Sequence, residues 1–387
     1  MELGILTPTK LPLMVNLSIW ERNALEHFDL VVIGSGIVGL STAYHFAKNH
    51  PKASVLIIER GATPSGASTK NAGFVCFGSI SELLDTESEM GSEGLVDLVE
   101  KRYKGGLELR KLLGDDKIGY APVGGYELLF NSEDHEERDR MNELLQPLFN
   151  TAVFSNNSAE IRQFRFSNKV KGLTKNSFEG TIDTGKMIRA FGRKNSEQGV
   201  HFMYKTEVFE VRPGPNPEVD IKLQGENWTI KAGKVALCTN AFSNQFLPSA
   251  AIVPGRGLIL VSKPVPGWSL EGSFHYHNGY NYFRSVGNRL LLGGGRHLDI
   301  SGEETMEFGI NERILRQLKE DMNDFIAPEL ELELDYQWSG IMAFGNTKAP
   351  EISKVDEGIY AAYRLGGMGV ALGTGVGQGL AKLMQED

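Results

Sequence analysis

The chain has 387 residues, of which 41% are hydrophobic and 23% charged, and its formal net charge is −9. This length exceeds what one simple hydrophobic core usually supports, so we expect two domains. The acidic balance, with no long basic run, argues against nucleic acid as a partner. The two cysteines, Cys76 and Cys238, suit a reducing compartment and exclude a disulfide framework.

Residues 1–28 are expected to form an extension that packs over the domain that follows, with Ile19 and Trp20 as its anchors. They do not resemble a signal peptide, because residues 1–10 hold a single lysine and the apolar run 11–15 is too short. No stretch approaches the roughly 18 apolar residues that a membrane span needs. We therefore expect a cytoplasmic protein without a membrane partner.

Residues 29–60 have the pattern of a strand, a helix and a second strand. The apolar run 29–33 leads into a GxGxxG spacing made by Gly34, Gly36 and Gly39. Gly34 permits a tight turn, Gly36 lets a pyrophosphate approach the backbone, and Gly39 lets the helix pack on the sheet. The second strand ends at Glu59, where a carboxylate can accept hydrogen bonds from a ribose diol. The pattern predicts a dinucleotide site; the alternative is a glycine-rich turn in an ordinary α/β domain.

A loop rich in small and hydroxyl-bearing residues follows at 61–78 and lacks the periodicity of a helix or a strand. Its backbone donors, together with Ser68 and Lys70, could reach a pyrophosphate or a ring system. The alternative is a solvated connection. A second glycine-rich turn, at 365–373, opens the last helix, so we expect both ends of the chain to meet at one ligand.

Helices and strands alternate between these two turns. Apolar residues at three- and four-residue steps predict a helix through 80–113. A hairpin is predicted over 120–130, with Gly124 and Gly125 at its turn. Further helices are predicted at 135–148, 184–194 and 307–326, and further strands at 200–211, 228–237, 258–261, 274–277, 280–284, 289–293 and 330–340.

Two histidines stand out in the β-rich part of the chain. His275 and His277 lie two residues apart on a predicted strand, so their side chains should share a face. That spacing suits a metal ion, but no third ligand is in sight. The favoured interpretation is a wall of imidazole and aromatic groups around a pocket.

Taken together, these motifs resemble those of the D-amino acid oxidase/sarcosine oxidase-like family of FAD-dependent oxidoreductases, over nearly the whole chain. The likeness is greatest to γ-glutamylputrescine oxidase-like members. Besides the GxGxxG turn and Glu59, it rests on the loop 66–73, Glu207-Val208, Thr239-Asn240-Ala241, Gly367 to Val370, and the segments 254–257 and 288–295.

The resemblance implies an α/β fold. A Rossmann-like FAD-binding domain with a mostly parallel sheet would comprise residues 1–115, 176–250 and 338–387. A second, α+β substrate domain with a large antiparallel sheet would comprise residues 116–175 and 251–337. FAD should be non-covalent, because neither cysteine lies where the family forms a cysteinyl–flavin bond. The expected cofactor-binding residues are Gly34, Ser35, Gly36, Ile37, Val38, Gly39, Glu59, Arg60, Ala67, Ser68, Lys70, Asn71, Ala72, Gly73, Val208, Thr239, Asn240, Ala241, Gly340, Gly367, Met368, Gly369 and Val370.

The chemistry implied by the resemblance is oxidation of a C–N bond in a small-molecule amine. Hydride passes from a substrate carbon to the flavin, the imine is then hydrolysed, and oxygen or another acceptor takes the electrons. Members that grip an amino-acid carboxylate often carry an arginine where this chain has Met342, so Arg284, Arg296 or Arg364 would have to substitute. The lysine that sarcosine oxidases direct at oxygen would fall near Leu291, which leaves oxidase versus dehydrogenase open.

As catalytic groups we expect His277, Tyr282, Arg284 and Arg296, although each could instead be a packing aromatic or a surface ion pair. Two other functions stay open. One keeps FAD but makes the substrate a hydroxy acid or a polyol phosphate. The other is a Rossmann-type nucleotide-binding protein without redox turnover.

Overall fold

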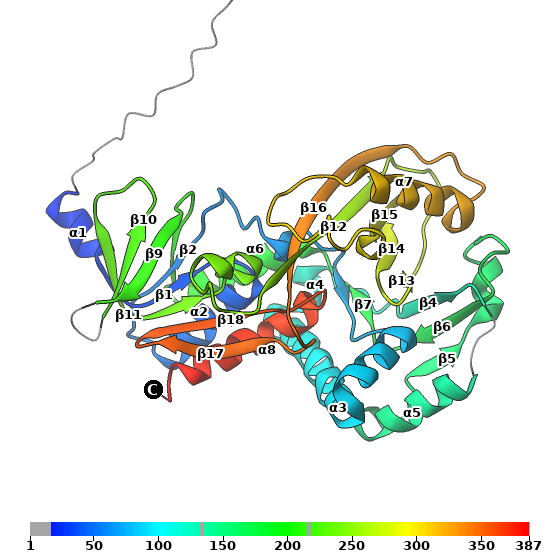
Figure 1. Cartoon of the computed structure of the whole chain (residues 1–387), viewed down its shortest axis with the longest axis horizontal. Coiled ribbons are helices and arrows are strands. Elements are labelled where there is room, and N and C mark those ends of the chain that lie inside the picture. Colours follow the sequence, from blue (N-terminus) through cyan, green and yellow to red (C-terminus); the bar gives the residue numbers. More distant parts are fainter. Residues whose placement is uncertain (1–16, 132–134, 215–217, 387) are drawn as a thin grey trace, which may run out of the picture.

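Two eight-stranded sheets organise the chain (Figure 1). The computed structural model describes residues 17–131, 135–214 and 218–386. The first sheet has the strand order β17-β18-β11-β1-β2-β8, with β10 and β9 added beside β11. Its bounds are β1 His27–Ile33, β2 Val55–Ile58, β8 His201–Met203, β9 Val208–Pro213, β10 Val219–Leu223, β11 Thr229–Leu237, β17 Glu351–Asp356 and β18 Ile359–Tyr363.

The central strands of the first sheet are parallel, and both of their faces are covered. β1 pairs in parallel with β2 and β11, and β18 and β8 extend this arrangement on either side. Leu30, Val31 and Val32 on β1 are fully buried, as expected for a strand enclosed on both faces. The remaining strands, β9, β10 and β17, pair antiparallel.

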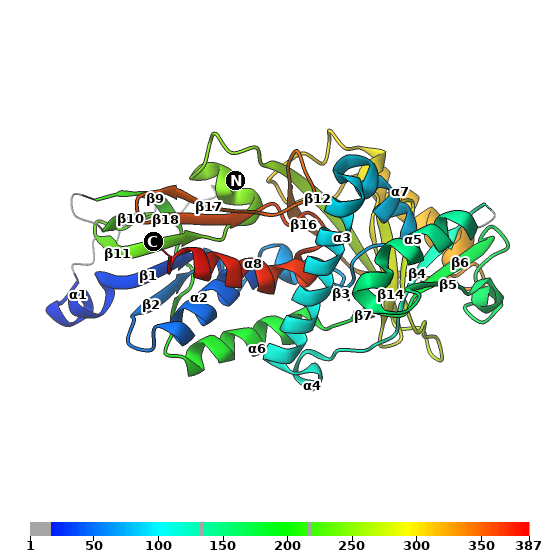
Figure 2. The same cartoon turned by 90° about the horizontal axis from the view of Figure 1, so that it is seen from below.

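Helices α2 (Ile37–Asn49), α6 (Thr184–Glu197) and α8 (Gly369–Leu383) lie along one face of this sheet (Figure 2). The first and last segments of the chain meet here, since α2 packs directly on α8. A Cβ atom added to Gly377 would lie 2.5 Å from Ser41 Cβ, and the Ser41 hydroxyl donates to the Thr374 carbonyl at 2.7 Å. Small residues in α8 therefore let the two glycine-rich turns approach one another.

The second sheet has the order β16-β12-β15-β14-β13-β4-β6-β5, and all its pairings are antiparallel except β13 with β4. A cluster of large side chains, among them Phe274, Phe283 and Phe325, packs α7 against one face of it. Its bounds are β4 Gly125–Leu129, β5 Phe154–Asn156, β6 Gly172–Asn176, β12 Val253–Ser262, β13 Ser273–Tyr276, β14 Asn281–Val286, β15 Arg289–Gly294 and β16 Leu334–Phe344, with α7 at Glu312–Asp321. The predicted fold, a mostly parallel sheet plus a large antiparallel one, is confirmed; the domain boundaries stay a prediction.

The remaining elements connect these layers. The long helix α3 is interrupted at Gly91, whose φ of 73° is left-handed. Asn311 caps α7 by accepting from the backbone of Arg313 and Ile314, so this helix begins later than residue 307. The bounds are α1 Ile19–Leu25, α3 Ile80–Leu113, α4 Asp115–Ile118, α5 His135–Phe149, β3 Phe74–Val75 and β7 Gly180–Thr181. In the described parts of the chain, no helix is long and apolar enough to cross a membrane.

Two expectations are wrong. Residues 120–130 do not form a hairpin, because the segment supplies only β4, whose partners are β6 and β13. Ile19 and Trp20 do not anchor the N-terminal segment, since they are 60% and 78% exposed on α1. The rest of the predicted extension, residues 1–16, lies outside the described residues.

The contact between α3 and α8 provides a test of this packing. A Cβ atom at Gly105 would lie 2.1 Å from the Ala371 carbonyl oxygen, whereas one at Gly192 on α6 meets nothing within 4 Å. We expect Gly105→Ala to destabilise the protein by about 2 kcal/mol or more through overpacking. Gly192→Ala should be neutral or stabilising by up to about 1 kcal/mol. Urea unfolding midpoints measure both, and equal shifts would contradict the packing described here.

Candidate functional site

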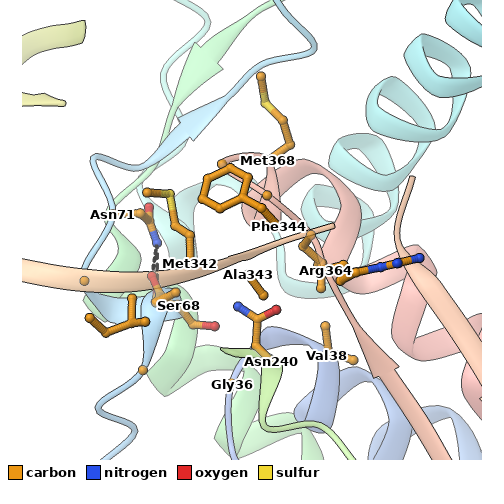
Figure 3. Close-up of a pocket in the computed structure, with 18 of the residues that line it drawn as sticks. Gly36, Val38, Ser68, Asn71, Asn240, Met342, Ala343, Phe344, Arg364 and Met368 are labelled. Atoms are coloured by element: carbon orange, nitrogen blue, oxygen red, sulfur yellow. Dashed lines mark hydrogen bonds between the residues drawn. The ribbon is translucent and has the colours of Figure 1, made fainter. Parts of the chain in front are cut away.

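A cavity of about 710 Å³ is lined by residues of both sheets and of both ends of the chain (Figure 3). The turn after β1, the loop after β2, the end of β16 and the turn before α8 all contribute to it. Parallel strands and helix N-termini deliver their loops to the same edge of a sheet, which is where nucleotides bind in such folds.

The GxGxxG turn is built for close backbone approach. Gly34 has a left-handed φ of 102°, and a Cβ atom there would lie 2.7 Å from the Cys238 carbonyl oxygen. A Cβ atom at Gly39 would lie 1.9 Å from the Gly34 oxygen, so only glycine lets α2 start here. Gly36 lines the cavity, and a Cβ atom there would lie 2.9 Å from the Ser68 hydroxyl oxygen, so glycine leaves room at this point. The Ile37 N–H of α2 donates to the Ser68 hydroxyl at 3.0 Å, and the N-terminal end of α2 lines the cavity, where the helix dipole favours an anion.

Glu59 is fixed at the end of β2 beside this turn. Its Oε2 accepts from the backbone N–H and the hydroxyl of Ser35, at 3.2 and 2.7 Å. Its Oε1 accepts from the Gly61 N–H at 2.9 Å. Next to it, the Arg60 guanidinium stacks on the Phe242 ring at 3.9 Å. The carboxylate is thus held at the cavity wall in the position expected for a ribose contact.

The loop 66–73 holds its own shape. The side-chain amide of Asn71 donates to the carbonyls of Ala67 and Ser68, and its oxygen accepts from the Gly73 N–H (Figure 3). The loop also contacts the second sheet, because Trp338 Nε1 donates to the Lys70 carbonyl at 3.1 Å. This loop therefore forms a wall between the two sheets.

Five buried polar atoms on the cavity lining have no hydrogen-bond partner among the described residues. They are Arg102 Nε, Asn240 Oδ1, His275 Nε2, Arg296 Nε and Arg364 Nε. Asn240 and Arg364 also adopt left-handed φ angles of 49° and 65°. Buried polar groups in folded proteins are normally satisfied. Their concentration here, together with the glycine cradle, fits a polar ligand the size of a dinucleotide.

The second sheet supplies an aromatic wall to the same cavity. His275 and Tyr282 are directly paired across β13 and β14, and the Phe74 ring packs against both at 5.1 and 5.8 Å. Gly293 pairs with Tyr282, where a Cβ atom would lie 2.6 Å from the ring. Burial lowers the pKa of His275 to about 4 and raises the pKa of Tyr282 to about 12. Both side chains are therefore neutral at pH 7.

The structure separates the four expected catalytic residues into two pairs. Tyr282 and Arg296 line the cavity. His277 lies outside its lining, because β13 ends at Tyr276 and the backbone turns left-handed at His277, with a φ of 50°. His275 lines the cavity in its place. Arg284 shares the face of Tyr282 but lies outside the lining, since its guanidinium donates to the carbonyls of Gly73 and Ile182.

The expected cofactor-binding residues line the cavity with three exceptions, Gly39, Gly73 and Ala241. Gly39 is covered by the Gly34 oxygen, and a Cβ atom at Gly73 would lie 2.4 Å from the Ile182 oxygen. Ala241 is fully buried. All three support the lining from behind. Sequence reasoning missed Phe344 and the acidic Glu82 and Asp85 on α3, which also face the cavity and belong to no recognisable motif.

Known proteins resemble this chain over most of its length. The DAO family model, described as FAD dependent oxidoreductase, matches residues 29–383. A probable oxidoreductase OrdL of Haemophilus influenzae is 24% identical over 382 residues, covering 90% of this chain and 80% of that protein. A sarcosine oxidase subunit beta of an Arthrobacter species is 27% identical over 222 residues, covering 55% of this chain and 51% of that protein.

Among solved structures, glycine oxidase from Geobacillus kaustophilus has the same fold, with a TM-score of 0.75 at 20% identity over 94% of this chain and 95% of that chain. L-proline dehydrogenase from P. horikoshii has a TM-score of 0.74 at 21% identity, covering 94% of each chain. The family resemblance seen in the sequence is confirmed, while the narrower likeness to γ-glutamylputrescine oxidases stays a prediction. This chain belongs to the DAO family of FAD-dependent oxidoreductases.

Proposed function

We propose that the protein holds FAD non-covalently in this cavity and oxidises the C–N bond of a primary or secondary amine or amino acid. The observation that carries the proposal is the continuity of one cavity, from the glycine turn at Gly34–Val38 to the aromatic wall at His275 and Tyr282. Bound FAD supplies a hydride acceptor for the carbon next to the nitrogen. The protein binds the amine, orients it and keeps it neutral.

The donor set supports FAD binding along the whole length of the cavity. The N-terminus of α2 and the loop 66–73 would hold the pyrophosphate, and Glu59 the ribose. Asn240 and the turn Gly367–Val370, at the start of α8, would hold the other groups of FAD. Neither thiol is suited to a covalent link, because burial raises the pKa of both Cys76 and Cys238, the latter to about 12. A thiolate is the nucleophilic form of cysteine.

Arg296 is the arginine that we assign to an acidic group on the substrate. Its guanidinium stacks over the Phe344 ring at 4.4 Å and lies 4.0 Å from Glu304, with Nε unpartnered. Arg284 is committed to backbone carbonyls, and Arg364 pairs with Glu351 at 2.8 Å. In Figure 3 the Arg364 side chain extends away from Met342. Arg296 can thus replace the arginine that the family often carries at the place of Met342.

The proposal is tested by anaerobic reduction of the bound flavin with a panel of amines, amino acids and hydroxy acids. Bleaching of the yellow colour by an amine or an amino acid is the expected result. Bleaching by hydroxy acids or polyol phosphates alone would contradict C–N oxidation. A colourless protein that binds NAD would contradict the proposed cofactor. Readmission of oxygen then separates an oxidase from a dehydrogenase by the rate of reoxidation.

Gly36→Val is expected to weaken FAD binding at least about tenfold, or about 1.4 kcal/mol. The φ of Gly36 is −71°, so valine strains no backbone angle and acts through the space it fills beside Ser68. Gly192→Val is the control, since this site on α6 is open and lies outside the cavity lining. The ratio of flavin to protein absorbance after dialysis measures the loss. Full flavin retention in Gly36→Val would show that no pyrophosphate approaches this turn.

Arg296→Met should raise KM by about 10- to 100-fold for substrates that carry a carboxylate. This is the effect of losing a charge-assisted hydrogen bond, which contributes about 1.5–3 kcal/mol. Substrates without an acidic group should change little. Arg193→Met, at an exposed position on α6, is the matched control. Steady-state kinetics with paired substrates, an amino acid and the corresponding amine, make the comparison. An equal effect on both would assign Arg296 to packing against Phe344.

A further inference from the structure

We propose that His275 and Glu179 act as a proton-accepting pair: the imidazole takes a proton from the substrate ammonium group, and the Glu179 carboxylate receives the proton that the ring gives up. This inference rests on the proposed amine oxidation. It deepens that function by saying how a substrate that arrives as a cation becomes the neutral amine that can lose hydride. Glu179 belongs to no motif recognised in the sequence, and His275 stands out there only by its spacing from His277.

His275 has the position that the role requires. It lies on β13 with its side chain 7% exposed, and its ring lines the cavity beside Tyr282. Its Nε2 is buried without a hydrogen-bond partner among the described residues. The Phe74 ring packs edge-on against the imidazole at 5.1 Å. A buried imidazole with an unpartnered nitrogen can take up a proton only if a nearby group compensates the charge.

Glu179 is that group. Its side chain is 2% exposed, and its Oε2 lies 4.0 Å from His275 Nε2. Its Oε1 accepts from the backbone N–H groups of Phe77 and Gly78 at 2.9 and 3.2 Å, which fixes the carboxyl in place. The fold makes room for it, since a Cβ atom at Gly125 would lie 2.0 Å from Oε2. The separation of 4.0 Å is about one ångström longer than a hydrogen bond, and such contacts in apo sites often shorten when substrate binds.

The surrounding charges leave Glu179 free to take a proton. Arg102 donates to Glu82 at 3.2 Å and to the Phe77 carbonyl at 2.8 Å. Burial, reinforced by the charge of Glu82, raises the pKa of Glu179 to about 8, while the two backbone donors and Arg102 act in the opposite direction. The other titratable groups packed around the pair are Cys76, Tyr120 and Glu127.

The proton balance of the step is complete. The substrate N–H bond breaks, and its proton forms an N–H bond on the imidazole. In this step Nδ1 takes the substrate proton, and Nε2, which lies 4.0 Å from Glu179 Oε2, releases its own proton to the carboxylate, which becomes a carboxyl. The nitrogen keeps its electron pair, and the neighbouring C–H bond then yields its hydrogen and two electrons to the FAD of the proposed function. Between turnovers the transfer runs in reverse: Glu179 returns its proton to Nε2, and Nδ1 releases the other proton to solvent in the cavity, which restores the starting tautomer.

The first test is the pH profile of anaerobic flavin reduction. In the wild type the rate should rise with pH to a plateau, with an apparent pKa near 8 that belongs to the pair. Glu179→Gln keeps the shape and the backbone hydrogen bonds but cannot accept a proton. It should lose this dependence and reduce the plateau rate by at least about 100-fold, as expected for the loss of a general base. His275→Asn should behave in the same way.

Glu127→Gln is the matched control, because Glu127 is equally buried and pairs with His275 across β4 and β13 but lies outside the cavity lining. Its pH profile should match the wild type. Profiles measured with two amines whose ammonium groups differ in pKa distinguish titration of the His275–Glu179 pair from titration of the substrate. A profile that moves with the substrate's own pKa, or one that Glu179→Gln leaves unchanged, would overturn the proposal.

The second test reads the protonation of Glu179 without catalysis. Because the native pKa of about 8 exceeds the ordinary 4.5, the native state binds a proton that the unfolded state has released in this interval. Stability contributed by this group is present at low pH and lost as pH rises toward 8. The urea midpoint of the wild type should therefore fall more steeply than that of Glu179→Gln. If the urea midpoints of the wild type and Glu179→Gln change equally with pH, the proposal is overturned. If no amine reduces the flavin of the wild type, the proposed function itself is refuted, whatever the urea midpoints show.

Discussion

The loop 66–73 is held from two sides at once, and the cavity depends on that constraint. From α2, which packs on the first sheet, the Ile37 N–H donates to the Ser68 hydroxyl at 3.0 Å. From the second sheet, Trp338 donates to the Lys70 carbonyl and Arg284 donates to the Gly73 carbonyl. These bonds require close approach, which the missing side chain of Gly340 permits: a Cβ atom there would lie 2.8 Å from Lys70 Cβ. The two sheets are therefore joined through a segment that lines the cavity, which positions the aromatic wall at His275 and Tyr282 relative to the turn at Gly34–Val38.

This arrangement carries an energetic cost that a ligand can offset. Arg102, Asn240, His275, Arg296 and Arg364 each present in the cavity lining a buried atom without a partner in the described part of the chain. A buried polar group left unsatisfied costs about 1–3 kcal/mol. A fold that tolerates five such atoms in one place is stabilised elsewhere, by the large clusters on both sheets. Binding of a polar cofactor returns hydrogen bonds to these groups, so we expect ligand-dependent stability.

The sequence was informative where function depends on local geometry. The turn at Gly34–Gly39 and the acid at Glu59 are determined by the spacing along one βαβ unit, and the structure brings them together. The wall of the second sheet depends on where strands end, which periodicity locates only to within a few residues. The predicted strand at 274–277 ends one residue earlier, so the cavity receives His275 and not His277.

Arg284 illustrates a second limit. It lies two residues after Tyr282 on β14, yet its donors go to Gly73 and Ile182, which lie far away in the sequence. Glu179 could not be identified at all, because its role depends on burial and on the contact with His275. Tertiary contacts of this kind leave no pattern in a single sequence.

Burial gives the aromatic wall of the cavity its chemical character. It lowers the pKa of His275 to about 4 and raises the pKa of Tyr282 to about 12, so that both side chains are neutral at pH 7. An environment that disfavours ionised side chains also disfavours an ammonium ion, because the charged form of either group loses its hydration. The same desolvation that makes these residues neutral therefore promotes the unprotonated amine from which hydride can leave. The proton-accepting pair that we propose would therefore act on an ammonium group whose pKa burial in the cavity lowers.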